Sequence, residues 1–211
     1  TAEWFVANEN YVPLEGFPYD TIAADLVADP GMTPEELSRD MVERYGELYR
    51  KGWLTELSAI RLSAIPAVTD ELWDVTDLLK ADMRRYRGLV AAGKAKATMG
   101  WSQYGWEAFV DLPTLFGVVH RRAPAGSALK AETGELLAAI DVAVPYVGMS
   151  PVGDVWPFGG IAVFFPGAEG SYVHNTFWRG SLYPTMQFAK DGWLDFLGAY
   201  FGGARRKAAM R

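Results

Sequence analysis

The sequence contains few side chains of the types that form a self-contained catalytic site. It has no cysteine and only two histidines, His120 and His174, which lie far apart and in no metal-binding spacing. The lack of cysteine excludes disulfides, thiolate metal sites and a thiol nucleophile from these residues, and it leaves the redox compartment undecided. We therefore interpret both histidines as partly exposed structural residues, and any thiol must come from outside this chain.

Other catalytic motifs are also missing. The Gly-x-Ser-x-Gly motif of serine hydrolases does not occur, and the glycine spacing at 100 to 105 lacks the lysine of a phosphate-binding loop. The acidic pairs Glu35-Glu36 and Glu43-Glu47 fall on the solvent-facing side of an expected helix, where helix-end and solubility roles explain them without catalysis. We predict no metal site from these residues.

Composition indicates a globular chain of about one domain. Its 211 residues are 50% hydrophobic and 14% aromatic, which is enough to bury a full-sized core. The 26 acidic residues exceed the 20 basic ones, so no sustained positive field attracts nucleic acid or anionic lipid. The longest apolar stretches are far shorter than the roughly 20 residues that cross a bilayer. We predict a soluble chain, secreted or cytoplasmic, with neither nucleic acid nor membrane as its partner.

The first elements that could position a site are a strand, a loop and a helix. Residues 3 to 7 form a short apolar run, and the next twelve are rich in Pro, Gly and Asn, which is typical of a loop. Loops that leave strands often carry function. Thr33-Pro34-Glu35-Glu36 combines a capping threonine, a first-turn proline and a glutamate at the third helical position. This pattern predicts a helix over 33 to 50.

The rest of the chain continues the alternation of strands and helices. We predict strands at 55 to 61 and 160 to 165, a long helix over about 65 to 90, a helix over about 127 to 140, and a last amphipathic helix from Trp193 to Tyr200. This order favours an α/β fold in which the strands lie mostly in one mainly parallel sheet layered by helices. We interpret residues 98 to 109, which include Trp101, Tyr104 and Trp106, as a packed edge, with a ligand-facing loop as the alternative.

Two segments near the start resemble the clostripain family of cysteine peptidases. Val6-Ala7-Asn8-Glu9 is similar to the strand end Ala-Ser-Glu-Glu that follows the family's catalytic helix. Glu15-Gly16-Phe17-Pro18-Tyr19-Asp20 is similar to the family's Gly-Trp-Pro-Tyr loop, with Phe17 in place of the usual tryptophan.

Further segments carry the resemblance along nearly the whole chain, in order. The most specific is Asp29-Pro30-Gly31-Met32-Thr33-Pro34-Glu35-Glu36-Leu37, which is similar to a family helix start throughout. Leu57 to Ser63 resembles the strand Leu-Ser-Ala-Val-Asp-Leu-Ser, with Arg61 at the position of the common aspartate. The weaker matches are Val110-Asp111-Leu112, 160 to 166, and 192 to 197.

The resemblance implies a caspase-like three-layer α/β sandwich with a mainly parallel sheet. Residues 1–201 would be the C-terminal part of that domain, and 202–211 a basic, frayed tail. A histidine and a cysteine form the catalytic dyad in such peptidases, and both would lie upstream of Thr1, which would be an internal start. His120 and His174 match no dyad position. A sheet truncated at Trp4 would expose an edge, so we expect an upstream chain of the same precursor as partner.

The resemblance also implies a substrate site in the loop after the first strand. Family members often carry an acid before the glycine of this motif, so Glu15 beside Gly16 would line the primary specificity pocket, with Asn8 and Glu9 in the same site. An acidic pocket suits the planar guanidinium of arginine, and lysine less fully. A solvated loop acid is the alternative role for Glu15.

The implied function is the larger, C-terminal subunit of a cysteine endopeptidase that cleaves polypeptides after Arg or Lys. No cofactor is predicted from the residues themselves, although the family resemblance allows calcium. Two other functions stay open. The chain could belong to an inactive relative that acts as a binding or regulatory module, or to an aromatic-rich carbohydrate-binding protein, given its 8 Trp and 10 Tyr.

Overall fold

The computed structural model describes residues 2–9, 12–50, 55–98, 109–149, 158–167 and 183–208. The strands are β1 (Trp4–Ala7), β2 (Glu56–Arg61), β3 (Phe109–Asp111), β4 (Tyr146–Met149) and β5 (Ala162–Phe164). The α-helices are α1 (Tyr19–Ala28), α2 (Pro34–Leu48), α3 (Ile65–Ala81), α4 (Met83–Ala97), α5 (Leu112–Arg122), α6 (Ala128–Ala143) and α8 (Leu194–Ala208). Shorter helical turns are η1 (Leu62–Ala64), η5 (Tyr183–Thr185) and η6 (Ala189–Trp193).

The described strands form two small antiparallel sheets. The first has the order β1-β2-β4, with Ala7 opposite Ser58 and Glu56 opposite Met149, and the second pairs β3 with β5. The three predicted strands are confirmed as β1, β2 and β5. The prediction that they lie mostly in one mainly parallel sheet is wrong for the described residues, since β5 belongs to the second sheet and every pair is antiparallel.

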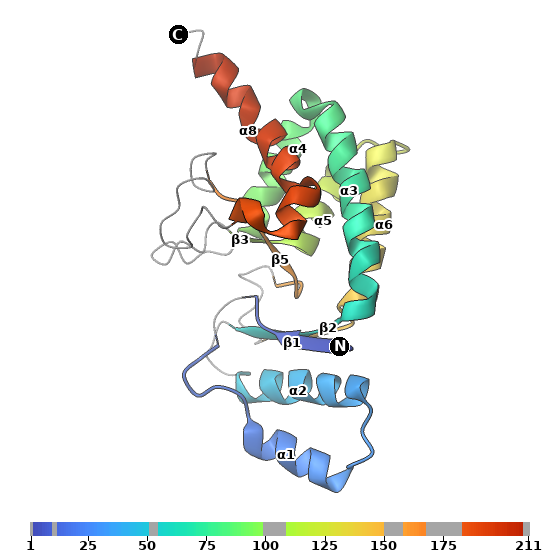
Figure 1. The fold of residues 1–211 in the computed structure, drawn as a ribbon, viewed down its shortest axis with the longest axis vertical. Helices are drawn as coiled ribbons and strands as arrows, with labels where there is room; N and C mark the ends of the chain where they lie inside the picture. The colour runs from blue at the N-terminus through green and yellow to red at the C-terminus, as the bar shows by residue number, and fades with distance from the viewer. Residues whose placement is uncertain are drawn as a thin grey trace.

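Helix α1 explains why β2 runs against β1. A single helix between two strands crosses the sheet once and makes the strands parallel, whereas the chain here crosses twice, along α1 and back along α2 (Figure 1). The chain therefore re-enters the sheet at the end where it left. We did not predict α1, because its N-cap is Pro18, which makes no side-chain capping bond, and none of its residues is buried.

Helix α2 confirms the predicted capping box and covers the first sheet. The Thr33 hydroxyl accepts from the Glu36 backbone N–H at 3.2 Å, and the Glu36 carboxylate accepts from the Thr33 N–H at 2.8 Å. The buried face of α2 packs against β2, where a small core joins Val42, Tyr45 and Tyr49 to Leu57 and Ala59. In Figure 1, α2 lies between the sheet and α1.

The larger core lies among the helices on the other side of the first sheet (Figure 1). The predicted helix over 65 to 90 is divided into α3 and α4 at Asp82, whose non-helical backbone ends α3 and whose side chain accepts from the Arg85 N–H. Helical spacing of apolar residues continues across the break because both helices face the same core. The predicted helix over 127 to 140 is confirmed as α6, with Ser127 as its cap.

Several predicted features fall beyond these elements. Trp101, Tyr104, Trp106 and His174 lie outside the described residues. Helix α8 is confirmed, and the frayed tail at 202–211 stays a prediction.

Within the described part of the chain, no helix combines the length and the apolar composition needed to cross a membrane.

Close approach of α2 to β4 predicts a stability effect at Gly148. A Cβ atom at this position would lie 2.5 Å from the Val42 carbonyl oxygen, which is backbone and cannot turn away. We expect Gly148→Ala to lower the free energy of unfolding by about 1–3 kcal/mol, as overpacking does. The matched control is Gly88→Ala on the exposed side of α4, where nothing lies within 4 Å and alanine should stabilise by up to about 1 kcal/mol. Equal urea midpoints for the two variants would contradict this packing.

Candidate functional site

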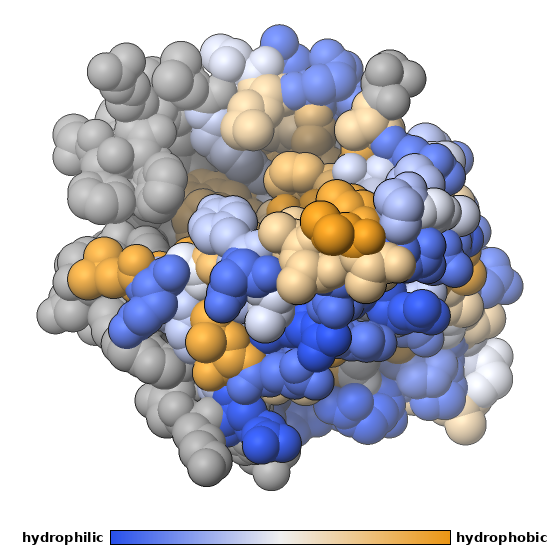
Figure 2. Space-filling view, turned by 90° about the horizontal axis from the view of Figure 1, so that it is seen from below, coloured by the Kyte–Doolittle hydropathy of each residue, from blue (hydrophilic) through white to orange (hydrophobic). Residues whose placement is uncertain are grey.

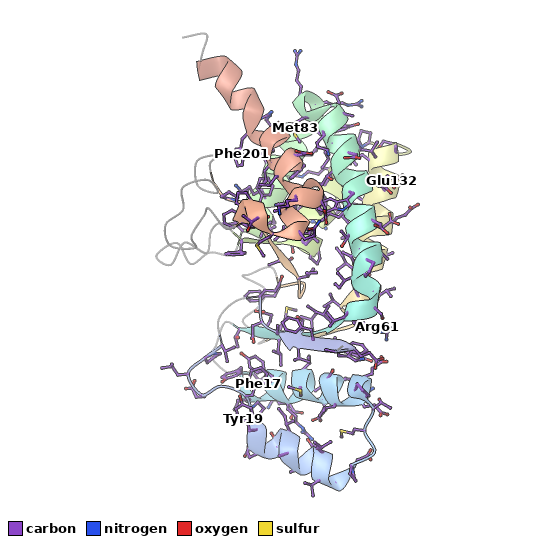
Figure 3. All side chains as sticks on the ribbon, in the orientation of Figure 1. Phe17, Tyr19, Arg61, Met83, Glu132 and Phe201 are labelled. Atoms are coloured by element: carbon purple, nitrogen blue, oxygen red, sulfur yellow. The ribbon has the colours of Figure 1, made fainter. Side chains whose placement is uncertain are left out.

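The loop between β1 and α1 is held on the aromatic side of α2. Gly16 adopts a φ of 73°, which favours glycine, and its N–H donates to the Pro13 carbonyl at 2.9 Å. The Tyr49 hydroxyl donates to the Gly16 carbonyl at 2.6 Å. Phe17 packs against Tyr45, with ring centroids 5.5 Å apart, and Figure 3 shows Phe17 beside α2. The backbone around Gly16 is therefore fixed.

Glu15 presents an exposed carboxylate from this fixed loop. None of the ion pairs among the described residues involves it. Burial raises the pKa of the Tyr49 hydroxyl, and the negative charge of Glu15 adds to this effect, so the carboxylate lies near the tyrosine that holds Gly16. The loop thus offers an acid to solvent beside an ordered turn, which is an arrangement that can bind a cationic side chain.

Asn8 connects the end of β1 to α2 and β2. Its amide nitrogen donates to the Tyr45 hydroxyl at 3.0 Å and to the Glu56 carbonyl, and lies 3.4 Å from the Thr55 hydroxyl. Tyr45 and Thr55 are themselves joined by a 2.8 Å hydrogen bond. The side chain of Asn8 is used in these contacts, and Tyr45 in turn packs against Phe17 of the loop.

The carboxyl of the partly buried residue Glu9 lies with those of the buried residues Glu56 and Asp111, in a group that we call the carboxyl cluster. The Glu9 backbone N–H donates to the Glu56 carboxylate, and Glu9 Oε2 accepts from the Gly160 N–H at 3.0 Å. Glu9 Oε1 is buried without a hydrogen-bond partner among the described residues, and the carboxyl group faces that of Asp111. Glu56 and Asp111 are both 0% exposed. Burial raises the pKa of Glu9 well above its ordinary value, and the charges of Asp111 and Glu56 raise it further. Sequence reasoning did not predict this cluster, although Glu9 and Asp111 both lie in matched segments.

Other polar residues that the sequence singled out have structural partners. His120 on α5 lies 3.0 Å from the Lys130 carbonyl and 3.1 Å from the Thr133 hydroxyl on α6, so its interpretation as a structural residue is confirmed. Glu35 is partly exposed and forms a 3.1 Å ion pair with Arg61. Arg61 is the last residue of β2 and is labelled in Figure 3. Arg61, which replaces the family's aspartate, is therefore part of a surface ion pair.

One further acidic group could hold a metal ion. Carboxylate oxygens of Glu71 and Asp74 on α3 and Glu132 on α6 lie within 4.8 Å of one another. Desolvation raises the pKa of Glu71, and the charges of the neighbouring acids raise it further. Figure 3 places Glu132 on the helical side of the molecule, away from Phe17 and the β1–α1 loop. This group is therefore separate from the candidate substrate loop.

A cavity of about 590 Å³ lies between α3, β5 and the segment around η5. Its lining includes Leu72, Val163 and Tyr183 and is almost entirely apolar. Burial raises the pKa of the Tyr183 hydroxyl, which has no hydrogen-bond partner among the described residues. A cavity without carboxylates cannot neutralise a guanidinium or an ammonium group, so it is not the pocket for a basic side chain.

Comparison with solved structures shows which proteins share the fold of this chain. An inactive zymogen C11 protease from Parabacteroides distasonis is 14% identical, with a TM-score of 0.57, covering 90% of this chain and 51% of that one. A secreted C11 cysteine protease from Bacteroides thetaiotaomicron, in complex with an irreversible peptide inhibitor, is 12% identical, with a TM-score of 0.51, covering 87% and 53%. The chain thus shares the α/β fold of C11 proteases and spans about half the length of these structures.

Family comparison settles the relationship that the motifs suggested. No curated protein matches the chain. The model of the clostripain family, peptidase family C11, matches residues 1–119, which is more than half of the chain. The match includes the loop with Glu15 and the capping box of α2. The chain belongs to the clostripain family of cysteine peptidases.

Proposed function

We propose that this chain is the C-terminal, larger subunit of a cysteine endopeptidase that cleaves polypeptides after Arg or Lys. An upstream chain of the same precursor supplies the histidine and cysteine. The observation that carries the proposal is the exposed, unpaired carboxylate of Glu15 among the described residues, on a loop held by Gly16 and Tyr49, in a member of the clostripain family.

Glu15 and Gly16 contribute the specificity of this enzyme. Arginine presents five N–H donors in a planar fork, so a carboxylate on an ordered turn can accept from it at two points, whereas lysine presents a compact charge. Because the Gly16 carbonyl is held by Tyr49, the position of Glu15 does not depend on an induced change in the loop. Asn8 takes part through Tyr45, which packs against Phe17 of the same loop, and Glu9 through its place next to Asn8.

The position of β1 supports the need for a partner. In the part of the chain that the structure describes, β1 lies at the edge of its sheet, with β2 as its neighbour, and Phe5 in this strand is 53% exposed. A second apolar region lies on the α1 side of the molecule. Figure 2 shows hydrophobic residues there among hydrophilic ones. Helix α1 exposes Leu26 and Val27. Open strand edges and large apolar patches are usually covered by another chain or segment.

The descriptions of the two solved structures support two parts of this proposal. One is described as an inactive zymogen, which supports a precursor, and the other binds an irreversible peptide inhibitor, which supports a polypeptide substrate.

A second candidate is an inactive relative that acts as a binding or regulatory module. It is favoured by two departures from the family pattern, Phe17 in place of tryptophan and Arg61 in place of aspartate. The sequence immediately upstream of Thr1 separates the two functions. The motif Asp-x-Cys shortly before Thr1, together with His-Gly farther upstream, would show that the protein has the catalytic residues of a peptidase.

Covalent labelling tests the proposed function. We expect an irreversible peptidyl inhibitor with arginine next to its reactive group to modify the upstream cysteine of the assembled protein, with one added mass per enzyme and loss of activity. The matched control carries aspartate in place of arginine and should not react, because Glu15 repels it. Mass spectrometry locates the label. Equal labelling by the two inhibitors would contradict the basic specificity, and failure of both to label a cysteine would contradict the peptidase.

A further inference from the structure

We propose that Glu9, as a protonated carboxylic acid, is a positioning residue that locks the Gly159-Gly160 segment and Asp111 to the end of β1. Loss of its proton releases this lock. The effect on activity rests on the proposed function, whereas the effect on stability does not.

The lock joins segments that are far apart in the sequence. The Gly160 N–H donates to the Glu9 carboxyl at 3.0 Å, and the neighbouring Gly159 N–H donates to Asp111 at 2.8 Å. The Ser58 hydroxyl, on β2, lies 3.0 Å from the Gly160 carbonyl and 3.1 Å from the Ala7 carbonyl. Since Glu9 follows β1 and Asp111 ends β3, these contacts hold the two sheets together.

The glycine pair can reach both carboxyls because it has no side chains. A Cβ atom on Gly159 would lie 2.8 Å from the Asp111 carboxylate, and one on Gly160 would lie 2.6 Å from Val144. Gly160 also has a φ of 89°, a conformation that other residues rarely adopt. The backbone of Gly159 and Gly160 is therefore in direct contact with the carboxyl cluster.

The neighbouring charges and hydrogen bonds of Glu9 and Asp111 indicate which of the two carboxyls carries a proton. Among the described residues, the charged groups that face Glu9 are the acids Asp111, from the β3–α5 junction, and Glu56, from β2, and none of the ion pairs there involves Glu9 or Asp111. Neighbouring buried carboxyls cannot all ionise. Asp111 accepts from two backbone N–H groups, of Thr114 and Gly159, which stabilise its anion, whereas Glu9 accepts from that of Gly160. Burial also raises the pKa of Asp111, but these hydrogen bonds oppose that rise, so we place the proton on Glu9.

A continuous set of contacts leads from the lock to the substrate loop. Asn8, next to Glu9, donates to the Tyr45 hydroxyl, and the rings of Tyr45 and Tyr49 lie 4.7 Å apart. Tyr49 in turn holds the Gly16 carbonyl beside Glu15. Glu9 thus acts on the pocket through these residues and does not need to touch the substrate.

The sign of the pH dependence follows from the direction of the shift. The pKa of Glu9 is raised in the folded protein above its ordinary value of 4.5. Its contribution to stability is therefore complete below about pH 4.5 and is lost as the pH rises through the folded-state pKa. Glu9→Gln has the shape of the neutral acid, with an amide that donates to Asp111 and a carbonyl that accepts from Gly160, and it does not titrate.

The experiment compares wild type, Glu9→Gln and Glu9→Ala in the assembled protein between pH 5 and 9, by Tm and by kcat/KM for an arginine substrate. We expect the wild-type Tm to fall relative to Glu9→Gln by about 3 °C or more as the pH rises. Glu9→Gln should keep at least about half of the wild-type kcat/KM at low pH with a flatter profile, and Glu9→Ala should lose about tenfold or more. Glu43→Gln, on the exposed side of α2, is the control that should change neither.

Three outcomes would overturn the proposal. The first is the same pH dependence of Tm in wild type and Glu9→Gln, and the second is a Glu9→Gln enzyme as impaired as Glu9→Ala. The third is stabilisation of wild type at high pH by millimolar Ca²⁺ that Glu9→Gln abolishes, because the cluster would then hold a cation. If the protein cleaves no peptide, the Tm comparison still tests whether Glu9 holds these segments together. Failure of this inference can therefore be distinguished from failure of the proposed function.

Discussion

Glu15→Gln is expected to lower kcat/KM for cleavage after arginine by about 30- to 1000-fold in the assembled enzyme. Removing one partner of a desolvated charge pair costs roughly 2–4 kcal/mol, which corresponds to that range. An acid that stays in solvent contributes under about 1 kcal/mol. Glu15 is exposed in this chain, so the size of the effect reports whether the upstream segment and the substrate together exclude water from it.

The substrate series and a matched variant make this test specific. The loss should be larger for arginine than for lysine, because the glutamine side chain cannot give two charge-assisted hydrogen bonds to a guanidinium. Asp20→Asn, which removes an exposed acid from the first turn of α1, should change kcat/KM by less than about threefold. A loss of less than about threefold for Glu15→Gln, with an unchanged Tm, would exclude the pocket role.

Residues 1–211 alone should hydrolyse no peptide, and activity should appear only with the upstream segment that carries the cysteine. The chain has no thiol, and loss of the nucleophile typically lowers kcat about a millionfold in enzymes of this mechanistic type. The measurement is cleavage of an arginine peptide by each chain and by their mixture. We expect activity in the mixture alone.

Controls separate assembly from chemistry in this experiment. Replacing the upstream cysteine with alanine should abolish activity while leaving the two chains associated, and a thiol-blocking reagent should do the same. Thiol-insensitive cleavage by purified 1–211 would contradict the proposed function. A precursor that has no cysteine at that position would decide for the inactive relative.

Local signals in the sequence were sufficient for several elements. The Thr33 capping box and the apolar spacing of α2 depend on residues a few positions apart, so the sequence determined this helix and its buried face. The same holds for β2, β5 and the helix that begins near Ser127, α6. The loop after β1 followed from its Pro, Gly and Asn content, the role proposed for Glu15 came from family motifs, and the clostripain assignment did not require the fold.

Strand direction and the carboxyl cluster were decided by tertiary structure. Helix α1 has no capping side chain and no buried residue, so its stability comes from contact with α2, and missing it reversed the predicted direction of β2. Glu9 and Gly160 are 151 positions apart, and the pKa of Glu9 is raised because the fold shields its carboxyl from water and brings Asp111 and Glu56 to it. A carboxyl's protonation depends on the groups that surround it in space, which neighbouring residues in the sequence do not specify.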